Sequence, residues 1–187
     1  MGKVVVTEFI SLDGVVEAPG GEGFKYPNWS FEVDRGTDGE QFKTDEALAA
    51  AALLLGRDTY EGFASAWPDF EGELADKYNG MPKYVVSSTL TDPGWNNTSV
   101  LSDDLAKDVT QLKQDVEGEI SVPGSIQLVQ GLLAHDLVDE IHLMWFPVIL
   151  GYGRRLWGAM PDKSNWALTE ATTYGDGVLV TIHQRTR

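Results

Sequence analysis

The chain has 187 residues, with 29 acidic and 14 basic side chains and a net charge of −15 at pH 7. This charge repels nucleic acids and anionic membranes, so neither is an expected partner. The absence of cysteine excludes disulfides, thiolate nucleophiles and cysteine-based zinc sites. Residues 1–187 are long enough to bury a core as a single domain. The apolar run near the start is too short for a signal peptide or a membrane span, and a cytoplasmic protein is expected.

The first half of the chain predicts a strand, a long loop and a helix. Val4–Ile10 is rich in β-branched residues and predicts a buried strand. Residues 11–40 contain six glycines and two prolines and predict an irregular loop. Loops of this length usually serve a site, so we expect an active-site loop. A helix is predicted to begin at Thr44 and to run through Ala52 into a strand at Leu53–Leu55.

The middle of the chain alternates helices and strands. Asp58 and Glu61 resemble a capping box, which predicts a helix at Thr59–Ala66. A helix at Glu71–Tyr78 precedes a strand at Lys83–Ser88, which ends in two hydroxyl side chains. Further predictions are the strand Thr98–Leu101, an amphipathic helix capped by Ser102 and ended by Gly118, the strand Glu119–Val122 and the helix Ile126–Ala134.

The last third of the chain predicts a long strand and a final antiparallel pair of strands. A long strand is predicted at Ile141–Leu150, and two final strands at Trp166–Thr173 and Val178–Arg185. Because Asp-Gly favours a hairpin, the final strands are expected to turn at Gly175-Asp176-Gly177. The whole pattern predicts an α/β fold, with a mainly parallel sheet flanked by helices and a C-terminal antiparallel hairpin.

Two strand-to-helix junctions carry most of the functional signal. Gly56 lies at the first junction, and Gly124 with Ser125 at the second. Glycine lets the backbone turn tightly and approach a ligand, and the next helix offers free N–H groups and a partial positive charge to an anion. Either glycine could simply make a turn, but the pair predicts a dinucleotide site. Arg57, beside the first junction, is the expected phosphate ligand, unless it forms only a surface ion pair.

Five segments, in order along nearly the whole chain, resemble the dihydrofolate reductase-like superfamily. The closer similarity is to its riboflavin-biosynthesis branch. That branch contains the reductase domains at the C-terminus of bifunctional pyrimidine deaminase-reductases, and their free-standing relatives. The HxE and PCxxC zinc-binding elements of a deaminase are absent from this sequence. The five segments are LGRDTYE (55–61), VSSTL (86–90), VPGS (122–125), LVDE (137–140) and PVILGYGRRLW (147–157).

The resemblance implies a dihydrofolate reductase-like fold that binds NADPH and passes hydride to a small heterocyclic or sugar-imine substrate. The closest activity would be that of 5-amino-6-(5-phosphoribosylamino)uracil reductase. The resemblance also implies that the protein could form a homodimer, in which Trp157 is a candidate contact residue. The implied cofactor ligands are Arg57, Ser87 and Ser88 at the 2′-phosphate, and Gly56, Thr59, Gly124, Ser125 and Ile126 near the pyrophosphate.

Reduction also needs a proton, and the resemblance indicates two candidate catalytic acids. Asp13 follows the first strand and would border the nicotinamide, and Glu40 falls near the helical acid of dihydrofolate reductases. Glu40 could equally be a surface charge in so acidic a chain. The three histidines lack metal-ligand spacing, so no metal is predicted.

Two alternatives stay open. One is a true dihydrofolate reductase, although those enzymes have consecutive glycines joined by a cis peptide where this chain has Pro123-Gly124. The other is a non-catalytic module that binds a nucleotide or another ligand on the same fold.

Overall fold

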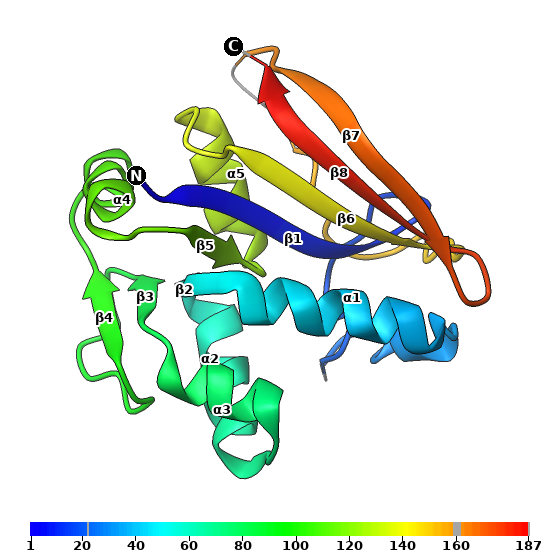
Figure 1. Cartoon of the computed structure of the whole chain (residues 1–187), viewed down its shortest axis with the longest axis horizontal. Helices are drawn as coiled ribbons and strands as arrows, with labels where there is room; N and C mark the ends of the chain where they lie inside the picture. The colour runs from blue at the N-terminus through cyan, green and yellow to red at the C-terminus, as the bar shows by residue number, and fades with distance from the viewer. Residues whose placement is uncertain (22, 159–161, 187) are drawn as a thin grey trace.

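The computed structural model describes residues 1–21, 23–158 and 162–186 (Figure 1). The strands are β1 (Lys3–Ser11), β2 (Ala50–Gly56), β3 (Lys83–Val86), β4 (Thr98–Leu101), β5 (Glu119–Val122), β6 (Glu140–Phe146), β7 (Asn165–Tyr174) and β8 (Val178–Thr186). The α-helices are α1 (Gly36–Ala49), α2 (Arg57–Ala66), α3 (Glu73–Gly80), α4 (Leu105–Asp115) and α5 (Ile126–Ala134), and the short 3₁₀ helices are η1 (Trp29–Glu32) and η2 (Trp67–Asp69).

The described strands form one eight-stranded sheet in the order β4-β3-β2-β5-β1-β6-β8-β7. Neighbours from β4 to β6 run parallel, whereas β8 pairs antiparallel with both β6 and β7. The predicted mainly parallel sheet with a C-terminal antiparallel hairpin is therefore confirmed. In the described part of the chain, no helix is both long and apolar enough to cross a bilayer.

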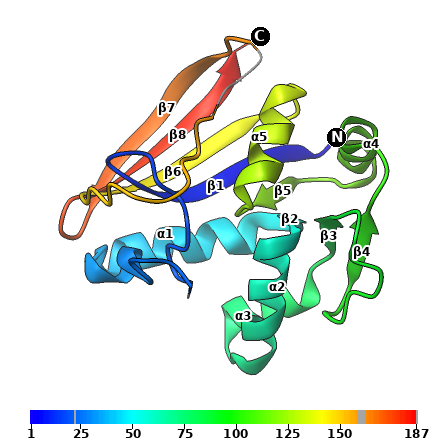
Figure 2. The same cartoon turned by 180° about the vertical axis from the view of Figure 1, so that it is seen from behind.

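Helices cover both faces of the sheet. Helix α5 lies behind β1 and β5 in Figure 1 and in front of them in Figure 2, whereas α1 crosses the opposite face. Side chains alternate between the faces along each strand, so one strand serves both layers. In β2, Leu54 packs in the cluster that contains α4 and α5, while Leu53 and Leu55 pack with Tyr60 of α2.

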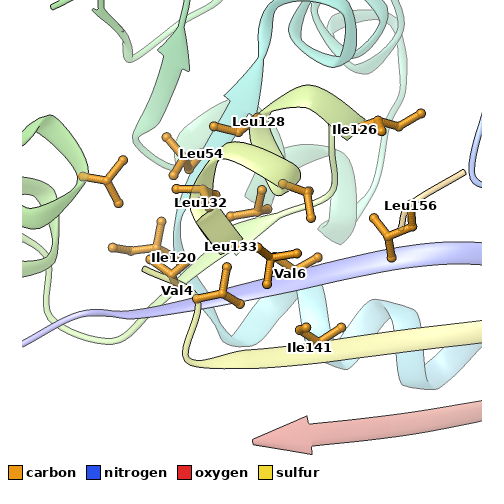
Figure 3. Packing of buried hydrophobic residues seen from close by; sticks show 14 of the residues in the cluster. Val4, Val6, Leu54, Ile120, Ile126, Leu128, Leu132, Leu133, Ile141 and Leu156 are labelled. Atoms are coloured by element: carbon orange, nitrogen blue, oxygen red, sulfur yellow. The ribbon is translucent and has the colours of Figure 1, made fainter. Parts of the chain in front are cut away.

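The largest core cluster fixes α5 on the sheet. Buried apolar residues recur along α5 at spacings of three and four, which places them on one face of the helix. Figure 3 shows Leu128, Leu132 and Leu133 lying over the strands that carry Val4 and Ile120. This packing holds the first turn of α5 beside the loop that leaves β5.

The predicted boundaries of the first loop and the first long helix are wrong. The loop at 11–40 was expected to be irregular throughout, but α1 already begins at Gly36, where the Asp34 carboxylate accepts the backbone N–H at 2.7 Å. The glycines obscured this helix. A Cβ on Gly39 would lie 3.0 Å from Cβ of Arg35 and 3.2 Å from Cβ of Tyr174, so glycine suits the close packing of the helix against β7.

Two predicted caps and one strand end are also wrong. Asp58 and Glu61 form no capping box, because α2 begins at Arg57 and its N-cap, Gly56, has no side-chain bond. Helix α4 is capped by Asp104, which accepts the Lys107 N–H at 2.8 Å, and not by Ser102. The strand expected to reach Leu150 ends at Phe146, since Pro147 has no N–H for the ladder.

A buried polar network joins α1 to the sheet. Glu46 of α1 accepts the Thr7 hydroxyl at 2.8 Å, forms an ion pair with Lys43 and lies 2.5 Å from Nδ1 of His142. The other ring nitrogen of His142 lies 2.8 Å from the Glu140 carboxylate. Burial alone would raise the pKa of Glu46, but Lys43 and His142 outweigh it and lower the pKa to about 2.

We expect Glu46→Ala to cost about 3–5 kcal/mol of unfolding free energy, because it leaves Lys43 and His142 without their buried partner. The Glu46 contribution is present above its unfolded-state pKa of 4.5 and is lost as the pH falls towards 2. Urea unfolding at pH 7 measures the loss. Asp45→Ala, an exposed change on the same helix, is the control and should cost no more than about 0.5 kcal/mol. Equal losses in the two variants would contradict the prediction.

Candidate functional site

The carboxyl ends of the parallel strands meet at one edge of the sheet. Open α/β sheets bind ligands outside this edge. Because β2 and β5 are neighbours, the two glycine junctions predicted from the sequence end side by side. The N–H of Gly56 donates to the carbonyl of Gly124 at 3.2 Å. The two junctions therefore form one continuous surface.

The contact between the junctions leaves no room for side chains. A Cβ on Gly56 would overlap Oγ of Ser125 and lie 3.0 Å from its backbone nitrogen. Gly124 has a φ of +120°, which favours glycine, and a Cβ there would lie 2.9 Å from Oγ1 of Thr59. The peptide bond between Gly124 and Ser125 is cis. The sequence did not predict this bond, because Pro123 interrupts the glycine pair of dihydrofolate reductases.

Both helices that start at this surface have free first turns. The N-cap of α2 is Gly56, which has no side chain, and the N-cap of α5 is Ser125, whose side chain forms no cap hydrogen bond. The N–H groups of the first turns, which include that of Ile126, therefore have no N-cap side chain as a partner in the described part of the chain. Two uncapped helix N-termini side by side offer donors and partial positive charge to an anion.

Arg57 lies at the β3 side of this surface. Its guanidinium donates to Oγ1 of Thr89 at 2.5 Å and to Glu61 at 2.7 Å. Ser87 holds the same loop, because its hydroxyl accepts the N–H groups of Thr89 and Leu90 at 3.2 and 3.0 Å. The structure thus brings Arg57 to the loop that contains Ser87 and Ser88, as the sequence led us to expect.

A hollow opens beside this loop, between β3 and the start of α4. Its lining includes hydroxyl side chains, two carboxylates and three apolar side chains. The lining residues are Val86, Ser87, Ser88, Thr89, Leu101, Ser102, Asp103, Leu105 and Asp108. The cation, the hydroxyl-rich loop, the hollow and the paired glycine junctions fit a nucleotide with a 2′-phosphate and a pyrophosphate, such as NADPH. Their assignment to that cofactor remains a proposal.

Asp13 is held in the loop after β1. Its carboxylate accepts the Ser11 hydroxyl at 2.7 Å and the N–H groups of Leu150 and Gly151 at 3.1 and 3.0 Å, and it pairs with Arg155. Burial alone would raise the pKa of Asp13, but these hydrogen bonds outweigh it and lower the pKa. Asp13 thus ties this loop to the turn after β6. Its predicted catalytic role stays a prediction that this geometry does not favour, because an ionised carboxylate has no proton to give.

Glu40 lies on the first half of α1. Its carboxylate pairs with Arg35 at 2.6 Å, and its side chain is 62% exposed. Arg35 itself covers the ring of Phe9, with 5.1 Å between the guanidinium carbon and the ring centre. The predicted role of Glu40 as an acid also stays a prediction, which its exposure and its ion pair do not favour.

Glu8 is the polar residue at this edge that the sequence analysis missed. It lies on β1 and is 7% exposed, and its Oε1 has no hydrogen-bond partner among the described residues. The same atom lies 3.7 Å from the Cβ position of Gly124. Burial raises the pKa of Glu8 to about 8, although Lys43 opposes the shift. The sequence feature that could have indicated this residue is an acidic side chain within the otherwise mainly apolar predicted strand Val4–Ile10.

No group of three or more histidine, cysteine, aspartate or glutamate residues in the described part of the chain could hold a metal ion. The expectation of no metal stays a prediction.

The chain is similar to a known family and to solved structures. The model of the RibD C-terminal domain family matches residues 2–180. "Uncharacterized protein YyaP" of Bacillus subtilis (strain 168) is 25% identical over 186 residues, which cover 97% of this chain and 94% of YyaP. A "Putative riboflavin biosynthesis protein" from Shewanella sp. PV-4 has a TM-score of 0.81 at 22% identity, over 99% of both chains. Dihydrofolate reductase from Enterococcus faecalis, complexed with NADP(H), has a TM-score of 0.61 at 14% identity, over 99% of this chain and 97% of the reductase.

These similarities settle two expectations. The family match confirms the resemblance to reductase domains of the riboflavin-biosynthesis branch. The structural matches confirm the dihydrofolate reductase-like fold. At sequence identities of 22% and 14%, the solved structures support the fold and not a shared activity.

We expect Glu8 to make the protein less stable as the pH rises. The folded-state pKa of about 8 exceeds the unfolded value of 4.5, so the folded state holds the proton more tightly between these pH values. The Glu8 contribution is fully present below pH 4.5 and is lost by about pH 8. The loss in unfolding free energy is at most about 1.4 kcal/mol per pH unit.

Urea unfolding of the wild type and of Glu8→Gln, measured from pH 5 to pH 9, isolates this contribution. Glutamine keeps the shape of the side chain and does not titrate in this range. As the pH rises to about 8, the unfolding free energy of the wild type should fall steadily relative to that of Glu8→Gln. A difference that stays constant with pH would contradict the prediction.

Proposed function

Since the chain belongs to the RibD C-terminal domain family, we propose that it is an NADPH-dependent reductase that acts on a small heterocyclic or sugar-imine substrate. The family and the fold support a reductase-type function and a small-molecule substrate. The observation that carries the proposal is the hydrogen bond between Gly56 and Gly124, which places two uncapped helix N-termini beside Arg57.

The residues of this surface would each hold one part of the cofactor. Arg57 and the loop at Ser87 and Ser88 would bind the 2′-phosphate, and the adjoining hollow would accept the adenosine. Gly124, Ser125 and Ile126 would give backbone N–H groups to the pyrophosphate, with the Thr59 hydroxyl on the other side. Gly56 would keep this surface open, because any side chain there overlaps Ser125.

The bound cofactor would supply a hydride, and the chain would position the acceptor and exclude water. An imine or carbonyl acceptor also needs a proton. Asp13 and Glu40 are the acids proposed from the sequence, and their ion pairs leave delivery through an ordered water as the route most consistent with the geometry. The uracil-type substrate named by the resemblance remains part of the proposal.

A cytoplasmic location and a homodimer belong to the same proposal. Trp157, the candidate dimer contact, is 45% exposed, and Ile149 in the turn after β6 is 72% exposed. Sedimentation of the wild type and of Trp157→Ser would test this contact.

We expect the protein to bind NADPH more tightly than NADH, and Arg57→Ala to remove this preference. A charge-assisted hydrogen bond contributes about 1.5–3 kcal/mol, which corresponds to about tenfold or more in affinity. Quenching of the six tryptophans during titration with each nucleotide measures both dissociation constants.

Glu61→Gln is the matched variant for the same assay. It removes the carboxylate that pairs with Arg57, so NADPH should bind at least as tightly as to the wild type, while NADH binding should not change. The proposal fails if a folded wild-type sample binds neither nucleotide. In that case a module for another ligand becomes the better description.

A further inference from the structure

Glu8 lies in the part of β1 that no longer pairs with β5. The pairing of β1 with β5 ends at Val6 and Val122, whereas the pairing with β6 continues to Ser11. Glu8 and Gly124 each lie two residues beyond the last β1–β5 pair. The two strands therefore diverge between them, and the Glu8 carboxyl group fills the gap.

One oxygen of the Glu8 carboxyl group is buried without a partner among the described residues. This oxygen, Oε1, is fully enclosed yet accepts no hydrogen bond from them. The buried carboxylates of Glu46 and Glu140, in contrast, are paired with His142 and a lysine. Buried polar atoms in folded proteins nearly always have a partner, so an orphan at the carboxyl edge of the sheet points to a ligand.

The order of the strands indicates which part of the ligand reaches Glu8. In the proposed site the adenosine end lies at β3 and the pyrophosphate lies where β2 and β5 end. The next strand in the sheet is β1. The end of the cofactor that lies beyond the pyrophosphate, the nicotinamide, would therefore meet β1, where Oε1 of Glu8 lies 3.7 Å from the Cβ position of Gly124. This step rests on the proposed function.

We propose that the Glu8 side chain binds the nicotinamide end of the cofactor by hydrogen bonds to the ring amide. The amide is the hydrogen-bonding group of the reduced ring. A protonated carboxyl group offers one donor and one acceptor, and a primary amide offers the same pair in the opposite sense.

The surroundings of Glu8 keep it in the protonated form. Burial raises its pKa to about 8, so the acid form dominates at pH 7. Lys43 of α1 is the cation that opposes this shift, and its ammonium group is already paired with Glu46. From α2, the group nearest the Gly124 gap is the uncharged hydroxyl of Thr59.

Two variants and two ligands test the proposal. Glu8→Gln keeps a donor and an acceptor, whereas Glu8→Met fills the same space without either. NADPH contains the ring amide, and adenosine 2′,5′-bisphosphate is the cofactor fragment without it. Calorimetric titrations from pH 7 to pH 9.5 give the dissociation constants, and thermal unfolding verifies that each variant is folded.

We expect Glu8→Met to weaken NADPH binding about tenfold or more at pH 7, and Glu8→Gln to stay within about threefold of the wild type. The wild type should lose affinity for NADPH as the pH rises through about 8, and Glu8→Gln should not. The bisphosphate should bind all three proteins equally. The infrared band of a protonated carboxyl group should be present in the wild type at pH 7, be absent in Glu8→Gln, and shift when NADPH binds.

The failure of this inference is distinguishable from the failure of the proposed function. If Glu8→Met binds NADPH as tightly as the wild type does, the role of Glu8 is overturned while the cofactor site stands. If the wild type binds neither NADPH nor the bisphosphate, the cofactor site itself is wrong, and the inference falls with it.

Discussion

The hydrogen bond between Gly56 and Gly124 is the constraint on which the candidate site depends. It forms because β2 and β5 are neighbours in the sheet, although they are far apart in the sequence. Glycine at position 56 lets the backbones approach until any side chain would overlap Ser125. The approach aligns the starts of α2 and α5, and the packing of α5 on the sheet maintains the alignment. A side chain at position 56 would therefore separate the two helix starts that are proposed to bind the pyrophosphate.

The negative charge of the protein opposes the binding of an anionic cofactor at the candidate site, so hydrogen-bond donors close to the phosphates would have to compensate for it. The chain carries a net charge of −15, and Asp103 and Asp108 line the hollow beside Ser87. Arg57 is itself paired with Glu61 in an exposed i,i+4 ion pair, which contributes only about 0.3–0.5 kcal/mol. A phosphate bonded by the same guanidinium would gain about 1.5–3 kcal/mol. By these values a phosphate would displace Glu61 from Arg57, so the proposed specificity for a 2′-phosphate is compatible with an acidic protein.

The sequence predicted the features that depend on local chemistry. The β-branched run of β1, the Asp-Gly hairpin and the two glycine junctions follow from propensity and periodicity, and the fold followed from their order. The start of α1 was missed because Gly36 and Gly39 are residues typical of a loop, although in the structure Gly39 packs closely against Tyr174. The caps of α2 and α4 were misplaced, since α2 begins directly after Gly56 without a side-chain cap, and both Ser102 and Asp104 are residue types that cap helices before α4. The contacts of Glu46 with Thr7 and His142, and the isolation of Glu8, depend on segments that are far apart in the sequence, which no local pattern encodes.

Four carboxyl groups in this structure have different roles because their surroundings differ. Asp13 receives hydrogen bonds from a hydroxyl and two amides and acts as an ionised clamp between loops. Glu40 faces solvent beside Arg35, and Glu46 is buried with its charge fully paired. Glu8 is buried with an oxygen that nothing in the described protein satisfies. An apolar residue in that place would avoid the cost of burying an unpaired polar group. A sequence that keeps a costly residue at the carboxyl edge of its central strands gains something other than stability from it, and a ligand is the gain that the position of Glu8 allows.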